Sequence, residues 1–212
     1  MKYSILSVIL IFCHSCKNSP FPGLFTKDLK KVEITLIDSL SKITVNVPVR
    51  YDTAFSWIHY SDCNTCHVQK YRIQSKGTPI VKESGFYWDR PGDSVDRLTI
   101  SHNHYLPGYV NDTTNLGIHS LFKDDLKYTR RGMKILKDTI QKINDRYFSI
   151  FELQSSDSVI RKEVFAITTI NGNFLNFSCE LVRRKENSIT RAFFINSANL
   201  VNSIIVKSVK KS

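Results

Sequence analysis

The chain has 212 residues, 42% of them hydrophobic, which is enough for one domain with a full core or at most two small ones. Thirty Lys and Arg residues against 19 Asp and Glu give a formal net charge of +11. No RNA-binding motif, helix-turn-helix signature or interleaving of basic and aromatic residues accompanies this charge, so we expect no nucleic-acid partner. The charge is spread over several short clusters, which favours a basic surface beside an anionic cell-envelope component.

The amino-terminal stretch MKYSILSVILIFCHSC has the pattern of a secretory signal. Lys2 precedes an apolar run from Ile5 to Phe12 that is too short to span a bilayer as a stop-transfer helix. We therefore expect residues 1–15 to be a signal peptide that is removed, and the protein to be exported.

The end of this stretch resembles the lipobox of bacterial lipoproteins, whose final cysteine becomes lipid-modified. Cys16 stands at that position and Ser15 supplies the small residue before the cleaved bond. Cys13 and His14 depart from the usual pattern, so the match is to a relaxed lipobox. The resemblance implies acyl chains on Cys16, a lipidated tether over residues 16–30 and membrane attachment in a bacterial cell envelope, facing the periplasm or the surface.

Residues 31–212 are expected to form a single α+β domain with a loop-rich β insertion at about 61–119. Alternation of apolar and polar residues predicts a first hairpin from strands over 31–38 and 41–49. The same alternation predicts further strands, separated by turn-forming residues, over 55–62, 67–75, 79–84 and 95–102.

A helix is expected at about 123–145, because its apolar residues recur at helical spacing and Asp124 and Asp125 would lie in its first turn. Strands over 147–154, 159–170 and 174–182 should follow as a meander, the last two joined by Asn171-Gly172, a dipeptide suited to a tight hairpin turn.

A strand over 189–195 then precedes a second expected helix at about 197–208, with Asn196 and Ser197 at its cap. The two helices are expected to cover one face of an antiparallel sheet.

This order of elements resembles the PsbP-like family, particularly in the run ITRAFFINSANLVNSIIV. The resemblance is topological and weak, and covers about residues 32–60 and 120–206. It implies an accessory or binding domain without enzymatic activity, and brings no functional residue to a matching position.

The segment Cys63-Asn64-Thr65-Cys66-His67 has a spacing with chemical meaning. In an exported protein, Cys63 and Cys66 are expected to form a disulfide that pins a hairpin turn. The spacing is also that of c-type haem attachment, with His67 as iron ligand, so a mono-haem electron carrier is one alternative. A thiol-disulfide redox protein, using the same two cysteines, is another.

A zinc site of Cys63, Cys66, His102 and His104 is a third alternative, because Ser-His-Asn-His in a strand puts both imidazoles on one face. Otherwise His102 and His104 are expected on an exposed strand face. Cys179 lies in phase with apolar residues and is expected to be buried.

Motifs of hydrolytic chemistry are absent from the sequence: it has no Gly-x-Ser-x-Gly elbow, no His-Glu-x-x-His and no phosphate-binding glycine loop. We interpret the protein as an exported, lipid-anchored cell-envelope protein that acts as a non-catalytic binding or structural module without a cofactor.

Overall fold

The computed structural model describes residues 29–37, 40–62, 67–83, 94–103, 115–155 and 157–207. In chain order, the strands and helices of these residues are β1 (Leu29–Thr35), β2 (Lys42–Pro48), β3 (Thr53–His59), β4 (Val68–Gln74), β5 (Val95–Asn103), α1 (Asn115–Thr129), β6 (Met133–Ile143), β7 (Arg146–Ser155), β8 (Ile160–Ile170), β9 (Asn173–Arg183), α2 (Ser188–Asn202) and β10 (Ile205–Lys207). The predicted α+β class is confirmed.

The strands form two antiparallel sheets. The larger has seven strands in the order β3-β4-β5-β9-β8-β7-β6, and the smaller has three in the order β1-β2-β10. The region 61–119, predicted as an insertion, contributes β4 and β5 to the larger sheet, where β5 pairs with β9. No strand forms over residues 79–83, although one was predicted there.

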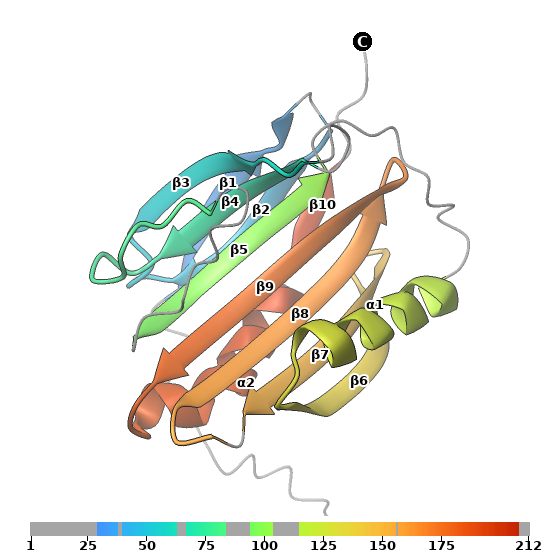
Figure 1. The fold of residues 1–212 in the computed structure, drawn as a ribbon. Coiled ribbons are helices and arrows are strands. Elements are labelled where there is room, and N and C mark those ends of the chain that lie inside the picture. Colours follow the sequence, from blue (N-terminus) through green and yellow to red (C-terminus); the bar gives the residue numbers. More distant parts are fainter. Residues whose placement is uncertain are drawn as a thin grey trace, which may run out of the picture.

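The two faces of the large sheet have different roles. One, here called the core face, packs against α2 and the small sheet and holds the main hydrophobic cluster. The other, here called the open face, is covered only in part, by α1 over β6, β7 and β8. Figure 1 shows α1 in front of the large sheet, with α2 and the small sheet behind it. The helices therefore lie on opposite faces, and the prediction that both cover one face is wrong.

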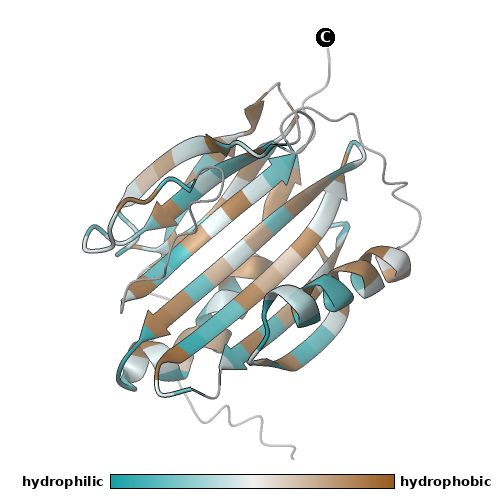
Figure 2. Ribbon diagram, in the orientation of Figure 1, coloured by the Kyte–Doolittle hydropathy of each residue, from teal (hydrophilic) through white to brown (hydrophobic). Residues whose placement is uncertain are grey.

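The two faces differ because apolar and polar residues alternate along the central strands. Successive side chains of a strand point to opposite faces of the sheet. In β9, Phe177 and Cys179 point into the core, whereas Ser178 and Glu180 lie on the open face. Cys179 is 3% exposed, which confirms its predicted burial. The resulting bands of apolar and polar residues are visible along the strands in Figure 2.

The predicted helix at 123–145 is wrong beyond residue 129, because residues 133–143 form strand β6. Gly132 adopts a φ of +87° just after α1, a conformation that favours glycine and ends the helix. A register shift between Ile135 and Lys137 then breaks the two-residue alternation of β6, so that its apolar residues imitate helical spacing. Asp124 and Asp125 lie well inside α1 rather than in its first turn.

The strand predicted over 189–195 and the helix predicted over 197–208 are replaced by one helix, α2. Its start is a capping box that the apolar pattern conceals: the Thr190 amide donates to Asn187 Oδ1 at 3.0 Å, and the Asn187 amide donates to Thr190 Oγ1 at 2.8 Å. Asn196 and Ser197, the predicted cap, lie inside the helix.

Removing this cap tests the assignment of the helix start. We expect Asn187→Ala to lower the free energy of unfolding by about 1 kcal/mol, because the Thr190 amide loses its acceptor. Asn199→Ala, at an exposed position within the same helix, is the control and should not lower stability, because alanine is the better helix former by up to about 0.7 kcal/mol. Urea denaturation of both variants measures the difference, and equal midpoints would contradict a stabilising capping box.

Candidate functional site

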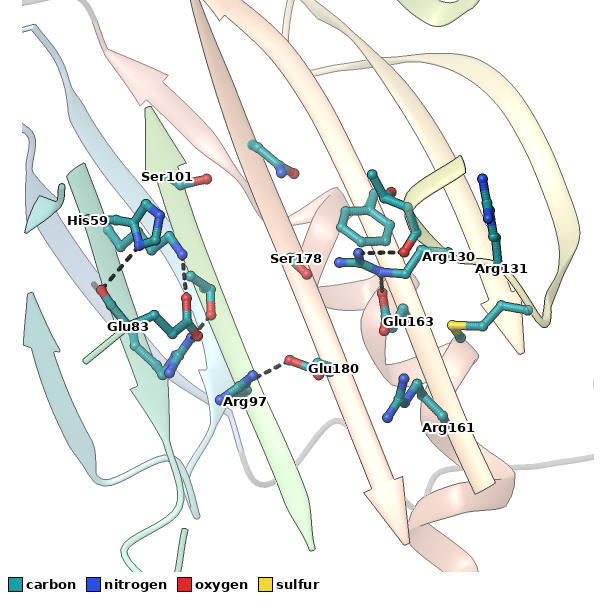
Figure 3. Close-up of a pocket in the computed structure, with 17 residues that line it drawn as sticks. His59, Glu83, Arg97, Ser101, Arg130, Arg131, Arg161, Glu163, Ser178 and Glu180 are labelled. Carbon is teal, nitrogen blue, oxygen red and sulfur yellow. Dashed lines mark hydrogen bonds and ion pairs between the residues drawn. The ribbon is translucent and has the colours of Figure 1, made fainter. Parts of the chain in front are cut away.

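A cleft with a volume of about 500 Å³ opens on the part of the open face that α1 leaves uncovered. Its floor comes from β4, β5, β8 and β9, and the turn after α1 closes one side (Figure 3). Most of its lining is polar. The Lys and Arg side chains that line it are Lys70, Arg72, Arg97, Arg130, Arg131 and Arg161, and the carboxylates are Glu83, Glu163 and Glu180.

One rim of the cleft is organised around Glu83. Arg72 Nη2 lies 2.9 Å from Glu83 Oε1, and Lys70 pairs with the other carboxylate oxygen. The Arg72 side chain is 3% exposed, and its guanidinium lies 4.7 Å from the centre of the Trp57 ring. Burial alone would raise the pKa of Glu83, but the hydrogen bonds from Arg72 and Lys70 outweigh it and lower that pKa to about 2. Glu83 is therefore ionised and holds this rim in place.

The opposite side carries two glutamates on neighbouring strands. Glu163 of β8 is directly opposite Glu180 of β9 in the sheet register. Each has its own partner: Arg130 Nε lies 2.7 Å from Glu163 Oε2, and Arg97 Nε lies 2.7 Å from Glu180 Oε2. Burial raises the pKa of Glu163, against the lowering effect of Arg130, and the Glu180 charge raises it further.

Two arginines of the cleft form no direct ion pair with a carboxylate of the described residues, although the Arg161 charge acts on Glu163 and helps to lower its pKa against the raising effect of burial. Arg161 is half-buried on β8, and Arg131 is exposed after α1, with its guanidinium 4.6 Å from the centre of the Tyr128 ring. Six Lys and Arg side chains against three glutamates leave an excess of three positive charges. The cleft is therefore suited to an anion.

Of the cysteine motif, only His67 is among the described residues. Cys63 and Cys66 lie outside them, as do Cys16 and His104. His59 of β3 pairs with Val68 of β4, so the motif joins two paired strands as predicted. His67 accepts a hydrogen bond from the Ser61 amide at 3.3 Å and packs edge-on against Tyr60. The disulfide and the haem, redox and zinc alternatives stay predictions.

His102 is 4% exposed and lies on the core face, its ring 5.9 Å from that of Tyr71. The prediction that it decorates an exposed strand face is therefore wrong, because the small sheet packs on this side. Within the described ranges, no group of three or more His, Cys, Asp or Glu side chains is placed to hold a metal ion. The same residues include no helix long and apolar enough to cross a bilayer.

A second polar cluster lies under α1. His119 Nε2 and Lys123 Nζ both contact the carboxylate of Asp138 on β6, and the His119 ring stacks on Phe151 at 4.7 Å. The hydrogen bond from Lys123 lowers the pKa of Asp138 against the effect of its partial burial. These contacts tie α1 to the large sheet, and we assign them a structural role.

None of the cleft residues was singled out by a sequence motif. A signal was present in the strands themselves: Arg97, Thr99 and Ser101 alternate with apolar residues of the core. Such alternation indicates which side chains share a face, but it does not show that the face is left uncovered.

No known family model and no curated protein matches the sequence. Among solved structures, the chain is similar to the solution structure of cyanobacterial PsbP (CyanoP) from Synechocystis sp. PCC 6803, with a TM-score of 0.46 and 10% sequence identity. The match covers 88% of this chain and 99% of the other. The predicted resemblance is confirmed only at this weak level, and no functional conclusion follows from it.

Glu83 allows a test of the electrostatics of the cleft. Its pKa of about 2 in the folded protein lies below its ordinary value of 4.5, so its contribution to stability is complete above pH 4.5 and is lost as the pH falls through about 2. We expect Glu83→Gln to lower the free energy of unfolding by on the order of 2 kcal/mol at pH 7, and by progressively less below pH 4.5.

Glu33→Gln is the matched control, because Glu33 also pairs with two lysines but is exposed to solvent, where such pairs contribute little. Urea denaturation at pH 7, 4 and 3 separates the two variants. A loss for Glu83→Gln that is the same at all three pH values would contradict the assigned ionisation.

Proposed function

We propose that the protein is an exported, lipid-anchored module of a bacterial cell envelope that binds an anionic ligand in the cleft without catalysing a reaction. The excess positive charge of the cleft carries this proposal, above all Arg161 and Arg131, which form no direct ion pair with a carboxylate of the described residues. Guanidinium groups suit this task because their planar set of donors matches carboxylate and phosphate groups.

Binding is favoured over catalysis by the way the glutamates are held. Glu163 and Glu180 each accept a hydrogen bond from an arginine, so they serve to balance and position those cations. Arg72 and Arg97 are buried, and their ion pairs hold them in place before any ligand arrives. A preorganised cationic site loses less side-chain entropy on binding than a flexible one.

The location of the protein is proposed from the sequence. The relaxed lipobox supports acyl chains on Cys16, and only thirteen peptide units separate that residue from Leu29, where β1 begins. A fully extended chain of this length spans at most about 45 Å, so the domain would stay close to the membrane. Cell envelopes are rich in anionic polymers and lipids, which a basic cleft attracts.

The anchor is tested by changing the acylated residue. We expect Cys16→Ser to move the protein from the membrane fraction to the soluble fraction in a bacterial host that processes lipoproteins. Cys13→Ser removes a cysteine from the same segment without touching the proposed attachment site, and should leave the protein on the membrane. An unchanged membrane fraction for Cys16→Ser would refute the anchor.

The cleft is tested with a simple polyanion, poly-L-glutamate, titrated calorimetrically into the detergent-purified protein. We expect the double variant Arg131→Gln, Arg161→Gln to bind at least about tenfold more weakly, because two charge-assisted hydrogen bonds are lost. The double variant Lys185→Gln, Arg191→Gln removes the same charge from exposed positions outside the cleft lining and is the control. Equal weakening in both would mean that net charge, and not the cleft, attracts the anion.

A further inference from the structure

One part of the cleft floor is uncharged, although the same strands also carry charged residues of the cleft. It carries the short polar side chains of Ser101 on β5 and of Asn176 and Ser178 on β9, with Ser101 directly opposite Asn176 in the register. Figure 3 shows Ser178 between Glu83 on one side and Glu163 on the other. The floor is therefore a hollow lined with hydroxyl and amide groups, between two groups of ion pairs.

These floor groups are not engaged in hydrogen bonds within the part of the chain that the structure describes. The side chains of Ser101, Asn176 and Ser178 make no hydrogen bond with any described residue, and Asn176 Oδ1 is buried without a partner. By contrast, Thr99 beside them accepts a hydrogen bond from Arg72 Nε at 3.1 Å. A buried polar atom without a partner is costly, and hydroxyl and amide groups both donate and accept. The floor thus offers donors and acceptors together.

A fully deprotonated inorganic anion such as sulfate has no hydrogen to donate, so it would leave the acceptors of the floor unused. The combination of a donor-and-acceptor floor with a guanidinium that forms no direct ion pair among the described residues matches a ligand that carries several hydroxyl groups and an acidic group. The cleft volume of about 500 Å³ lies inside the range of about 300–1,000 Å³ that is typical of small-ligand sites.

We propose that the ligand is an acidic carbohydrate, whose hydroxyl groups bind Ser101, Asn176 and Ser178 and whose acidic group pairs with Arg161. This inference rests on the proposed anion-binding function and specifies the ligand class. Arg161 is assigned to the acidic group because it is half-buried in the cleft and forms no direct ion pair with a carboxylate of the described residues, Glu163 being paired directly with Arg130. An acidic peptide is the competing ligand, and its binding is one outcome of the test.

The test compares three tetramers of equal length by calorimetry with the full-length protein purified in a non-ionic detergent: tetragalacturonate, tetraglutamate and maltotetraose. The first carries both acidic groups and sugar hydroxyls, the second only the acidic groups, and the third only the hydroxyls. We expect tetragalacturonate to bind at least about tenfold more tightly than either of the others, because only it satisfies both the floor and Arg161.

The outcomes separate the two proposals. Tetraglutamate binding as tightly as tetragalacturonate would overturn the carbohydrate inference and leave anion binding intact. Maltotetraose binding as tightly as tetragalacturonate would overturn the role of Arg161. Failure of all three tetramers, together with failure of poly-L-glutamate, would overturn the proposed function and the inference with it.

Variants of the floor supply a second readout. We expect Ser101→Ala with Ser178→Ala to weaken tetragalacturonate binding at least about fivefold and to leave tetraglutamate binding unchanged, since only the sugar uses these hydroxyls. Ser56→Ala, at an exposed position on β3, is the control. If the double variant does not fold, Ser178→Ala alone carries the test, and unchanged tetragalacturonate affinity would overturn the assigned contacts.

Discussion

The pairing of β8 with β9 is the interaction on which the rest of the structure depends. The turn at Asn171 and Gly172, with φ of 47° and 73°, sets a register that places Glu163 opposite Glu180. The same register directs Phe177 into the core under α2 and Ser178 onto the floor of the cleft. Because side chains alternate between faces, a slip of one residue would exchange the core and the cleft. Core and site are therefore specified by a single hairpin.

The charged residues of the cleft are not explained by stability alone. Arg72 and Arg97 are buried with their carboxylate partners, and burying an ion pair carries a desolvation cost that apolar residues would avoid. Among the described residues, a comparable group lies on the core face, where the buried Asp96 accepts from Arg50 Nε at 2.8 Å and from the Tyr51 hydroxyl at 2.5 Å, with Arg183 Nη2 3.9 Å away. That group is centred on a single buried carboxylate, toward which both arginines and the Tyr51 hydroxyl are directed. The cleft retains cations in excess of its carboxylates, which favours a binding role.

The sequence predicts elements well where local alternation is unbroken, as in the first hairpin and in strands β7, β8 and β9, and it also predicts the burial of Cys179. The prediction from sequence fails where a local irregularity gives the apolar residues the spacing of a different secondary structure. The bulge after Ile135 makes a strand resemble a helix, and the apolar run over 189–195 hides a helix whose start depends on the side chains of Asn187 and Thr190. The cleft could not be predicted in the same way, since its residues come from strands more than 100 positions apart. Only the pairing order of the sheet and the limited reach of α1 bring them together on an uncovered surface.

The order of the layers in the fold places the start of the described chain and the cleft on different sides of the large sheet. The described chain enters the fold at Leu29 in the small sheet, which packs on the core face, whereas the cleft lies on the open face of the large sheet. Leu29 and the cleft therefore lie in opposite layers of the domain (Figure 1). A tether that holds the small-sheet side toward the bilayer leaves the cleft directed toward the aqueous envelope. With a reach of up to about 45 Å, the proposed tether would let the open face contact ligands in the aqueous envelope, whether these are soluble or part of a polymer.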